Sequence, residues 1–372
     1  MKLLVISHTA HYIKSDGIVV GWGPTIKEIN ALTTIFDEII HVAPLHAEPA
    51  PNSAIAYETG VIYKPLKPSG GSFLKKLTIL LRAPFNLWQI YTYSKNVDFI
   101  QFRAPTGMGL YVLPYLKFCN RKQYWIKYAG NWVATNLSLG NKFQKWWLQH
   151  IISSKIKVTV NGQWPHEKQH ILAFENPCLS EQERIEGLKV IEKKQLGNNY
   201  QYCFVGSLTE NKGIQYLVKA FLSLDHTTIG GMHIVGDGQL KEQLELEAKQ
   251  LKIPVHFYGY LTKDEIIKIY IKCHFIMLPS QSEGFPKVIG EAMNYGCVPI
   301  VSEVSCINQY IRNEYNGFLI NPITAENIKL IIAESLEMSN DTFQSYININ
   351  YKIAKKFTYA YYLERIKREI LN

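Results

Sequence analysis

Short apolar runs alternate with longer segments of mixed polarity along the whole chain. In the first half these runs cover residues 3–7, 38–42, 99–102, 124–128 and 157–161. A second series covers residues 202–205, 232–235, 255–258, 275–278 and 298–301. Nearly continuous apolar runs of this length, separated by helical segments, are typical of parallel strands buried on both faces. The pattern predicts an α/β protein with two domains, each a doubly wound parallel sheet.

The region between the two series suggests where the domains meet. It contains Asn176-Pro177 and the charged stretch 181–194. A turn marked by proline favours a boundary. We therefore expect a hinge near residues 177–198.

Composition supports a soluble two-domain protein. The chain has 372 residues, 47% of them hydrophobic and 19% charged, which is enough apolar surface for buried cores. The N-terminus meets His8 before any long apolar core, and uncharged apolar runs fall short of the roughly 20 residues that a membrane helix needs. The six cysteines include no C-x-x-C pair, which suits reduced thiols. These features predict a cytoplasmic protein.

The positive charge is concentrated in one stretch. Residues 59–166 hold fifteen Lys and Arg against one acid, Asp98, whereas the overall net charge is +9. Such a field favours anionic lipid, lipid-linked phosphate or nucleic acid as a neighbour. Charge alone leaves these three open.

An amphipathic segment within this stretch favours a membrane surface. At helical spacing one face is apolar and the other polar; the apolar face holds Phe73, Leu77, Leu80, Leu81, Pro84, Trp88 and Tyr91, and the polar face holds Lys75, Lys76, Arg82, Asn86 and Gln89. Most such helices simply cover a core. A second basic and aromatic cluster at residues 142–147 shifts the expectation towards peripheral attachment, with no nucleic-acid partner.

Loops after the strands of the second half carry unusual residues. Ligands bind at the carboxyl ends of parallel strands, so these loops are candidates for chemistry. Gly206 allows close backbone approach and Lys212 offers a charge for phosphate. The turn 236–238 lacks the full dinucleotide-binding spacing. The strongest signal is 279–293, where a carboxylate precedes a Gly-Phe-Pro turn and a helix that begins near Pro286.

Glu283 and Glu291 raise the alternative of a glycosidase. Paired glycosidase carboxylates stand roughly 5 to 9.5 Å apart. Eight steps of a mostly helical segment would separate these two by on the order of 12 Å. We therefore expect them to contact two parts of one elongated ligand, such as a nucleotide sugar.

The segment 204–322 resembles the retaining glycosyltransferases of family four (glycosyl transferases group 1). The resemblance rests on 205–208 with Lys212-Gly213, on 234–238, on 257–260, and on the two glutamates separated by seven residues that end at Glu291. It implies the GT-B fold, with two Rossmann-like domains facing a central cleft. More loosely, it implies an acceptor-binding domain at 1–178, a nucleotide-sugar-binding domain at 179–354, and a closing helix at 355–372 that packs back towards the first domain.

The same resemblance implies roles for individual residues. Glu283 would position the transferred sugar, Glu291 would bind the ribose, and Lys212 would hold the diphosphate. Tyr260 would lie at the base, and the remaining donor contacts would come from Gly206, Ser207, Gly284, Phe285, Pro286, Lys287 and Val288. Transfer would retain the anomeric configuration and need neither metal nor cofactor, with a UDP-sugar or GDP-sugar as donor.

Two positions depart from the family pattern. Ser207 stands where the family usually has Arg, so one cation for the leaving diphosphate is missing; Arg103, after the strand 99–102, is a hypothetical substitute. Pro286 replaces a family Gly and has no N–H to donate. In the first domain, Asp16 and Asn131 are candidates for acceptor contact.

The sequence therefore predicts a peripheral hexosyltransferase on the inner face of the plasma membrane. Its acceptor would be a lipid-linked saccharide in surface polysaccharide assembly, such as capsule or lipopolysaccharide. Two alternatives remain open: a nucleotide-sugar epimerase of the same fold, and a non-catalytic basic module that binds membrane or nucleic acid.

Overall fold

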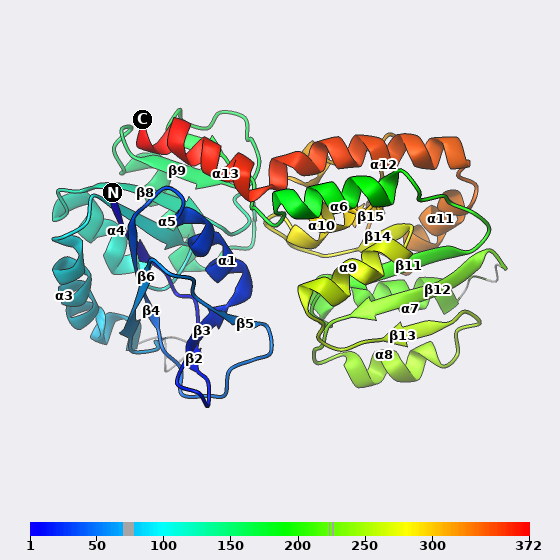
Figure 1. Ribbon diagram of the computed structural model, residues 1–372, viewed down its shortest axis with the longest axis horizontal. Helices are drawn as coiled ribbons and strands as arrows, with labels where there is room; N and C mark the ends of the chain where they lie inside the picture. The colour runs from blue at the N-terminus through cyan, green and yellow to red at the C-terminus, as the bar shows by residue number, and fades with distance from the viewer. Residues whose placement is uncertain (70–77, 223, 225–226) are drawn as a thin grey trace. The chain divides into compact units, whose positions relative to one another are not determined.

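The computed structural model describes residues 1–69, 78–222, 224 and 227–372, which divide into two compact units (Figure 1). Unit 1 contains Met1–Glu175 and Tyr362–Asn372, and unit 2 contains Asn176–Tyr361. The sequence placed the corresponding boundaries after residues 178 and 354. Residues 355–361 therefore group with unit 2, and only the last part of the expected closing helix belongs to unit 1.

Unit 1 is built on a parallel sheet of seven strands. In spatial order these are β10 (Ile171–Ala173), β9 (Lys157–Val160), β8 (Gln123–Tyr128), β7 (Phe99–Ala104), β1 (Lys2–Ile6), β4 (Glu38–Pro44) and β6 (Val61–Leu66). The chain extends the sheet on one side of β1 through β4 and β6, and on the other side from β7 onwards. The switch in direction therefore falls between β1 and β7, where open α/β sheets bind ligands.

Alternate residues of the strands fill two cores, one on each face of this sheet. Leu4 and Ile6 belong to a core covered by α3 (Ala83–Ser94), α4 (Gly109–Phe118) and α5 (Leu139–His150). Leu3 and Val5 belong to a core covered by α1 (Gly23–Leu32), α13 (Tyr359–Arg365) and the final helical turns η4 (Ile366–Leu371). This two-residue alternation is the geometry of a strand, and it confirms the doubly wound arrangement.

A small antiparallel sheet accompanies unit 1. Its strands are β2 (His11–Ile13), β3 (Val19–Trp22) and β5 (Ala54–Ala56), with β3 in the centre. β2 begins only five residues after β1 ends, so this sheet is placed beside the carboxyl end of the first parallel strand.

Four side chains form a buried polar cluster in unit 1. Glu28 of α1 accepts hydrogen bonds from Arg103 (Nη1 at 2.7 Å, Nη2 at 3.4 Å), from Lys127 Nζ at 2.7 Å and from Tyr362 Oη at 3.0 Å. Glu28 is 1% exposed. One carboxylate therefore compensates two buried cations, and Tyr362 connects the returning C-terminal segment to the N-terminal helix.

Unit 2 repeats the architecture with six parallel strands. Their spatial order is β13 (Val255–Phe257), β12 (Ile229–Val235), β11 (Tyr200–Val205), β14 (Phe275–Leu278), β15 (Val298–Ser302) and β16 (Phe318–Ile320). The helices are α6 (Glu181–Ile191), α7 (Ile214–Leu222), α8 (Lys241–Ala248), α9 (Lys263–Lys272), α10 (Lys287–Asn294), α11 (Ala325–Leu336) and α12 (Asn340–Ala354), with short turns η1 (Glu210–Lys212), η2 (Ile307–Gln309) and η3 (Lys355–Phe357). Here the switch in winding falls between β11 and β14.

The ten predicted parallel strands are confirmed, and the boundary between the two units falls between Glu175 and Asn176, just before the range 177–198 in which a hinge was expected. Residues 181–191 form α6, which begins with a capping box between Ser180 and Glu183. Arg184 of this helix donates to Asn294 Oδ1 of α10 at 2.7 Å. The charged stretch is thus a packed helix of unit 2, in which Arg184 is buried while Glu181, Glu186 and Lys189 are exposed.

The amphipathic segment 73–91 covers the core of unit 1 with Ala83 and Ile90, while most of its large apolar side chains point to solvent. Residues 73–77 lie outside the described residues. Leu80, Leu81, Phe85, Trp88 and Tyr91 are 49–78% exposed. Asn86, expected on the polar face, is buried and donates to Tyr111 Oη at 2.9 Å. Within the described residues, no helix is long and apolar enough to cross a membrane.

Candidate functional site

In unit 2 the loops after β11 and β14 meet at the switch point. The backbone N–H of Gln281 donates to the carbonyl of Asn211 at 2.8 Å, and Asn211 Nδ2 donates to the carbonyl of Ser282 at 3.3 Å. These two bonds fix the loop that carries Lys212 against the loop that carries Glu283. Two strand-end loops that are distant in sequence thus form one surface.

Lys212 and Glu283 form an ion pair on this surface. Their side chains are 23% and 10% exposed, so both are shielded while part of each still reaches solvent. Gly213 follows in the left-handed conformation, with φ at 70°, and an added Cβ would lie 2.1 Å from the carbonyl oxygen of Pro279. Only glycine permits this approach, which brings Lys212 to Glu283.

The loop after β12 supports the loop after β11. Gly206 donates its N–H to Val235 O at 3.0 Å, and Leu208 donates to Asp237 O at 2.9 Å. Gly236 has φ at 135°, and a Cβ there would lie 1.8 Å from the carbonyl oxygen of Gly206. The Gly206 carbonyl therefore makes a close contact with the backbone at residue 236. This contact is possible because residue 236 is a glycine without a Cβ.

The segment from Gly284 onwards leads into α10. Pro286 is the N-cap, one position earlier than a first helical residue, with φ at −74°. Lys287 and Val288 therefore occupy the first turn, where amides have no acceptor within the helix. The Phe285 ring stacks on Phe357 at 4.4 Å in a buried cluster, so only the Phe285 backbone is placed for a ligand.

Glu291 lies further along α10 among polar partners that the sequence did not reveal. Tyr270 Oη donates to Glu291 Oε2 at 3.5 Å. Burial lowers the pKa of Lys263, but the nearby carboxylates of Glu291 and Glu183 outweigh burial and hold it above its usual value. Lys263 is the first residue of α9 and donates to Cys178 O at 2.6 Å. Its only sequence signal is its position just after a strand-end loop.

Two other predicted donor residues lie at the edges of this region. Ser207 is exposed and follows Gly206 directly. Tyr260 follows β13 and is 64% exposed. The structure places Glu283 and Lys212 in contact, whereas Tyr260 and Glu291 belong to neighbouring parts of the same sheet edge.

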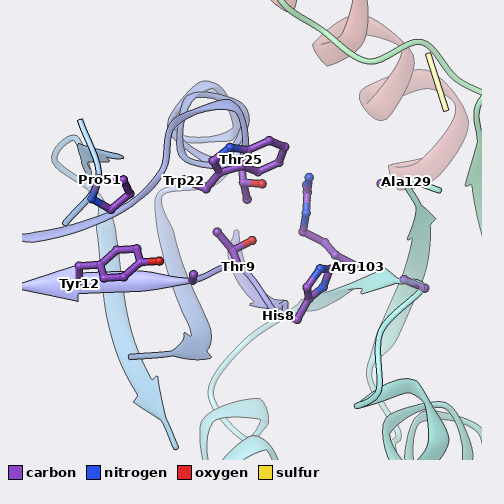
Figure 2. A pocket seen from close by; sticks show the side chains of 10 residues that line it. His8, Thr9, Tyr12, Trp22, Thr25, Pro51, Arg103 and Ala129 are labelled. Atoms are coloured by element: carbon purple, nitrogen blue, oxygen red, sulfur yellow. The ribbon is translucent and has the colours of Figure 1, made fainter. Parts of the chain in front are cut away.

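Unit 1 has a pocket of about 330 Å³ at its own switch point (Figure 2). Residues 8–10 follow β1, Arg103 and Ala104 end β7, and Ala129 follows β8; the remaining lining comes from Tyr12, Trp22, Thr25 and Pro51. Figure 2 shows the His8 ring next to Arg103. Loss of hydration, and then the Arg103 charge, lower the pKa of His8 from its usual value. A neutral imidazole and a cation thus line a cavity with two aromatic rings.

The sequence identified only Arg103 among these pocket residues. Its guanidinium is held by Glu28, so a substitution at Arg103 also disturbs the buried cluster, and its assignment to a leaving diphosphate stays a prediction. The described lining does not include Asp16 or Asn131. Asp16 Oδ1 accepts the N–H of Ile18 at 3.0 Å and Asn131 Oδ1 accepts the N–H of Val133 at 3.1 Å, so each stabilises a local turn.

Among the residues that the structure describes, no three His, Cys, Asp or Glu side chains gather in a way that could hold a metal ion.

Comparison with known proteins relates this geometry to a family. Residues 189–353 match the family Glycosyl transferases group 1. An uncharacterized glycosyltransferase of Methanocaldococcus jannaschii is 32% identical over 59% of this chain and 53% of its own length. The Campylobacter jejuni GalNAc-alpha-(1->4)-GalNAc-alpha-(1->3)-diNAcBac-PP-undecaprenol alpha-1,4-N-acetyl-D-galactosaminyltransferase is 28% identical over 53% of this chain and 52% of its own length. The chain spans about half the length of these curated relatives.

A solved structure extends the likeness to the whole fold. HepE of Anabaena in complex with UDP and glucose superposes with a TM-score of 0.70, at 18% identity, over 100% of both chains. Both units are thus Rossmann-like, as in GT-B structures. The segment 189–353, which carries Lys212 and Glu283 on the strand-end loops of unit 2 and Glu291 in α10, thus matches the glycosyl transferases group 1 family.

Proposed function

We propose that this protein is a retaining, metal-independent glycosyltransferase that moves a hexosyl group from a UDP-sugar or GDP-sugar to a lipid-linked saccharide. The observation that carries the proposal is the Lys212–Glu283 ion pair at the switch point of unit 2. A cation and a carboxylate at the carboxyl ends of parallel strands suit a ligand with an anionic part next to hydroxyl groups. A nucleotide sugar has both.

In this proposal each group meets a different part of the donor. Lys212 compensates the diphosphate, and its contact with Glu283 holds that carboxylate beside the transferred sugar, where it accepts hydrogen bonds from hydroxyls. The backbone of 284–288 lines the sugar and phosphate, with Gly206 and Ser207 opposite. Glu291 accepts hydrogen bonds from the ribose, and Tyr260 adjoins the base.

The acceptor would bind in unit 1. The pocket at the β1/β7 switch point offers aromatic faces from Tyr12 and Trp22 together with polar groups from His8 and Thr9. Apolar ring faces with a few placed polar groups suit a saccharide, which has both C–H faces and hydroxyl edges. The name of the Campylobacter relative, which includes a diphosphate-linked undecaprenol, supports the lipid-linked acceptor and a place in surface polysaccharide assembly.

Thermal stabilisation by nucleotides tests the donor site. A ligand at 100 times its Kd adds about 2.7 kcal/mol of stability, which corresponds to a rise in Tm of about 5 °C or more for a unit of this size. We expect such a shift with UDP or GDP and their sugars, and its loss in Glu291→Ala. Scanning calorimetry of the intact chain measures it.

Glu334→Ala is the matched control, because Glu334 is an exposed glutamate in the last turn of α11. It should keep the full nucleotide shift. No shift with any nucleotide would refute the transferase and favour a basic binding module. Conversion of a nucleotide sugar with no acceptor present would favour an epimerase.

We also propose that unit 1 attaches the enzyme to the inner face of the plasma membrane. The supporting surface is the outward side of α3 and of the helical residues just before it, formed by Leu80, Leu81, Phe85, Trp88 and Tyr91. The three helices α3, α4 and α5 contain no Asp or Glu. Exposed leucines and aromatic rings can insert into the interfacial region of a bilayer. Because these helices lack acidic residues, nearby Lys and Arg can contact anionic headgroups without repulsion from carboxylates.

Flotation with vesicles tests this attachment. We expect the protein to float with phosphatidylglycerol vesicles, less so at 0.5 M salt, and to bind at least about tenfold more weakly as Phe85→Ser with Trp88→Ser. Ile185→Ser with Leu188→Ser is the control, since these residues are similarly exposed on α6 of unit 2. Equal binding by both double variants would contradict the proposed surface.

A further inference from the structure

Five groups in unit 1 form a closed ring of hydrogen bonds behind the pocket. The N–H of Thr9 donates to Ser7 Oγ at 3.1 Å, Ser7 Oγ lies 2.7 Å from His41 Nε2, and His41 Nδ1 contacts Tyr57 Oη. Tyr57 Oη contacts His11 Nε2, and His11 Nδ1 lies 2.8 Å from the carbonyl oxygen of Thr9. The ring therefore begins and ends on the backbone of Thr9, which lines the pocket.

The backbone sets the direction of every bond in this ring. The Thr9 N–H can only donate and the Thr9 carbonyl can only accept. His11 therefore carries a proton on Nδ1, and Ser7 Oγ accepts a hydrogen bond from the Thr9 N–H. The Ser7 hydroxyl then donates to His41 Nε2, His41 donates from Nδ1 to Tyr57, and Tyr57 donates to His11 Nε2. Five donors meet five acceptors with both imidazoles neutral. The opposite direction would require a charged His11 or leave a buried donor unpaired.

The surroundings favour neutral imidazoles. His11 and His41 are both 0% exposed. Burial lowers the pKa of His11 to about 4, against weaker opposing contributions from the Thr9 and Pro44 carbonyls, and the charge of His46 lowers it further. Burial, then the charges of His11 and Arg103, hold the pKa of His41 well below its usual value.

Aromatic and backbone packing closes the space around His11. The Tyr63 ring stacks on His11 at 4.4 Å, and its hydroxyl donates to Ala43 O at 3.0 Å, outside the ring of hydrogen bonds. A Cβ on Gly21 would lie 2.7 Å from the His11 ring. The imidazole therefore has no room to turn away from its partners.

We propose that this ring is a positioning device: Ser7, His11, His41 and Tyr57 fix residues 8–10 in the pocket wall, and the pocket binds its ligand only while both imidazoles are neutral. Protonation would place an imidazole N–H against the Tyr57 hydroxyl or the Ser7 hydroxyl, where two donors face each other. The ring would open, and the wall that presents His8 and Thr9 would lose its support. The identity of the ligand as an acceptor saccharide rests on the proposed function. The positioning role of the hydrogen-bond ring does not depend on that function.

Imidazole nitrogen spectra of the intact chain test the ring directly. At pH 7 we expect His11 and His41 to be neutral with the proton on Nδ1, assigned by comparison with His11→Gln and His41→Gln. An Nε2–H form or a charged ring at either position would overturn the proposal. Neither outcome depends on the enzyme's activity.

Hydrogen exchange at residues 8–10 tests the positioning role. Tyr57→Phe should lower their protection about tenfold, because two ring bonds are lost. Tyr63→Phe is the matched control, since the Tyr63 ring stacks on His11 but its hydroxyl donates to Ala43 O, outside the ring of hydrogen bonds. In wild type and Tyr63→Phe this protection should fall between about pH 6 and pH 4, and in Tyr57→Phe it should already be low at pH 7.

Equal protection in the two variants, or no pH step in wild type, would overturn the positioning role. In transfer assays Tyr57→Phe should raise KM for the acceptor about tenfold while UDP binding stays unchanged. If the protein transfers no sugar at all, the proposed function fails, but the spectra and the exchange still decide the ring.

Discussion

Replacing Glu283 with glutamine is expected to lower kcat for sugar transfer at least about 100-fold, while nucleotide affinity changes by no more than about threefold. The side chain keeps its size but loses the charge that pairs with Lys212 and the second acceptor oxygen. Groups that stabilise charge or hold the reacting sugar typically contribute 10² to 10³ in turnover. Steady-state transfer kinetics and calorimetric titration with UDP measure the two effects separately.

The control for this experiment is Glu210→Gln. Glu210 lies in the same strand-end turn, two residues before Lys212, and its side chain is exposed. It should retain turnover within about threefold. If Glu283→Gln also stayed within that range, the Lys212–Glu283 pair would have no part in transfer, and the main support for the proposed function would be removed.

Replacing Glu28 with glutamine is expected to destabilise unit 1 by about 3–5 kcal/mol. The substitution leaves Arg103 and Lys127 buried without the carboxylate that they share. Removal of one partner from a buried ion pair costs far more than the pair contributes, because the remaining charge has lost its hydration. Urea unfolding followed by tryptophan emission measures the loss for unit 1 alone, since all seven tryptophans lie in this unit, at positions 22, 88, 125, 132, 146, 147 and 164.

Glu38→Gln provides the comparison for the same measurement. Glu38 pairs with Lys2 at 3.1 Å, but both side chains are substantially exposed, so we expect a loss below about 1 kcal/mol. Similar losses for Glu28→Gln and Glu38→Gln would show that the buried cluster is stabilised by its hydrogen bonds to other groups rather than by the shared carboxylate.

Much of the fold could be predicted from the sequence because parallel strands that are buried on both faces consist of nearly continuous apolar residues. β6 was not predicted, since Lys64 and Pro65 interrupt its pattern, and both are tolerated because β6 is at the edge of the sheet. The three-residue strands β2, β5, β10 and β16 were also missed, although β13, which is equally short, was predicted. Most of the strands that the sequence predicted are buried on both faces, and most of those it missed are short or lie at a sheet edge.

Some residues of the candidate site and of the buried cluster could likewise be predicted from the sequence, and others could not. Lys212 and Glu283 were found because each follows a predicted strand, yet their contact depends on Gly213 and on loop bonds between residues about 70 positions apart. Glu28 was missed because it lies in the middle of a helix, where a glutamate is ordinarily exposed. Nothing local distinguishes a glutamate that will meet Arg103 and Lys127 in the folded chain.

The orientation of the amphipathic segment 73–91 could not be predicted from the sequence. Its period identifies two faces, but a period does not say which face points inwards. In α3 small and polar residues, Ala83, Asn86 and Ser94, pack against the sheet alongside Ile90, while the large rings point outwards. The orientation is set by the space left beside α4, which is a property of the assembled core.

The hydrogen bond from Tyr362 to Glu28 joins residues that are 334 positions apart. At about 5–20 residues per second of synthesis, roughly 20 to 70 s separate the appearance of its two partners. Unit 1 leaves the ribosome first but is completed last, after every residue of unit 2 has been made. During that interval the face that later receives Tyr362 and Ile366 presents Phe36 and Trp125 to water. The nascent chain therefore exposes an apolar surface of the kind that chaperones bind.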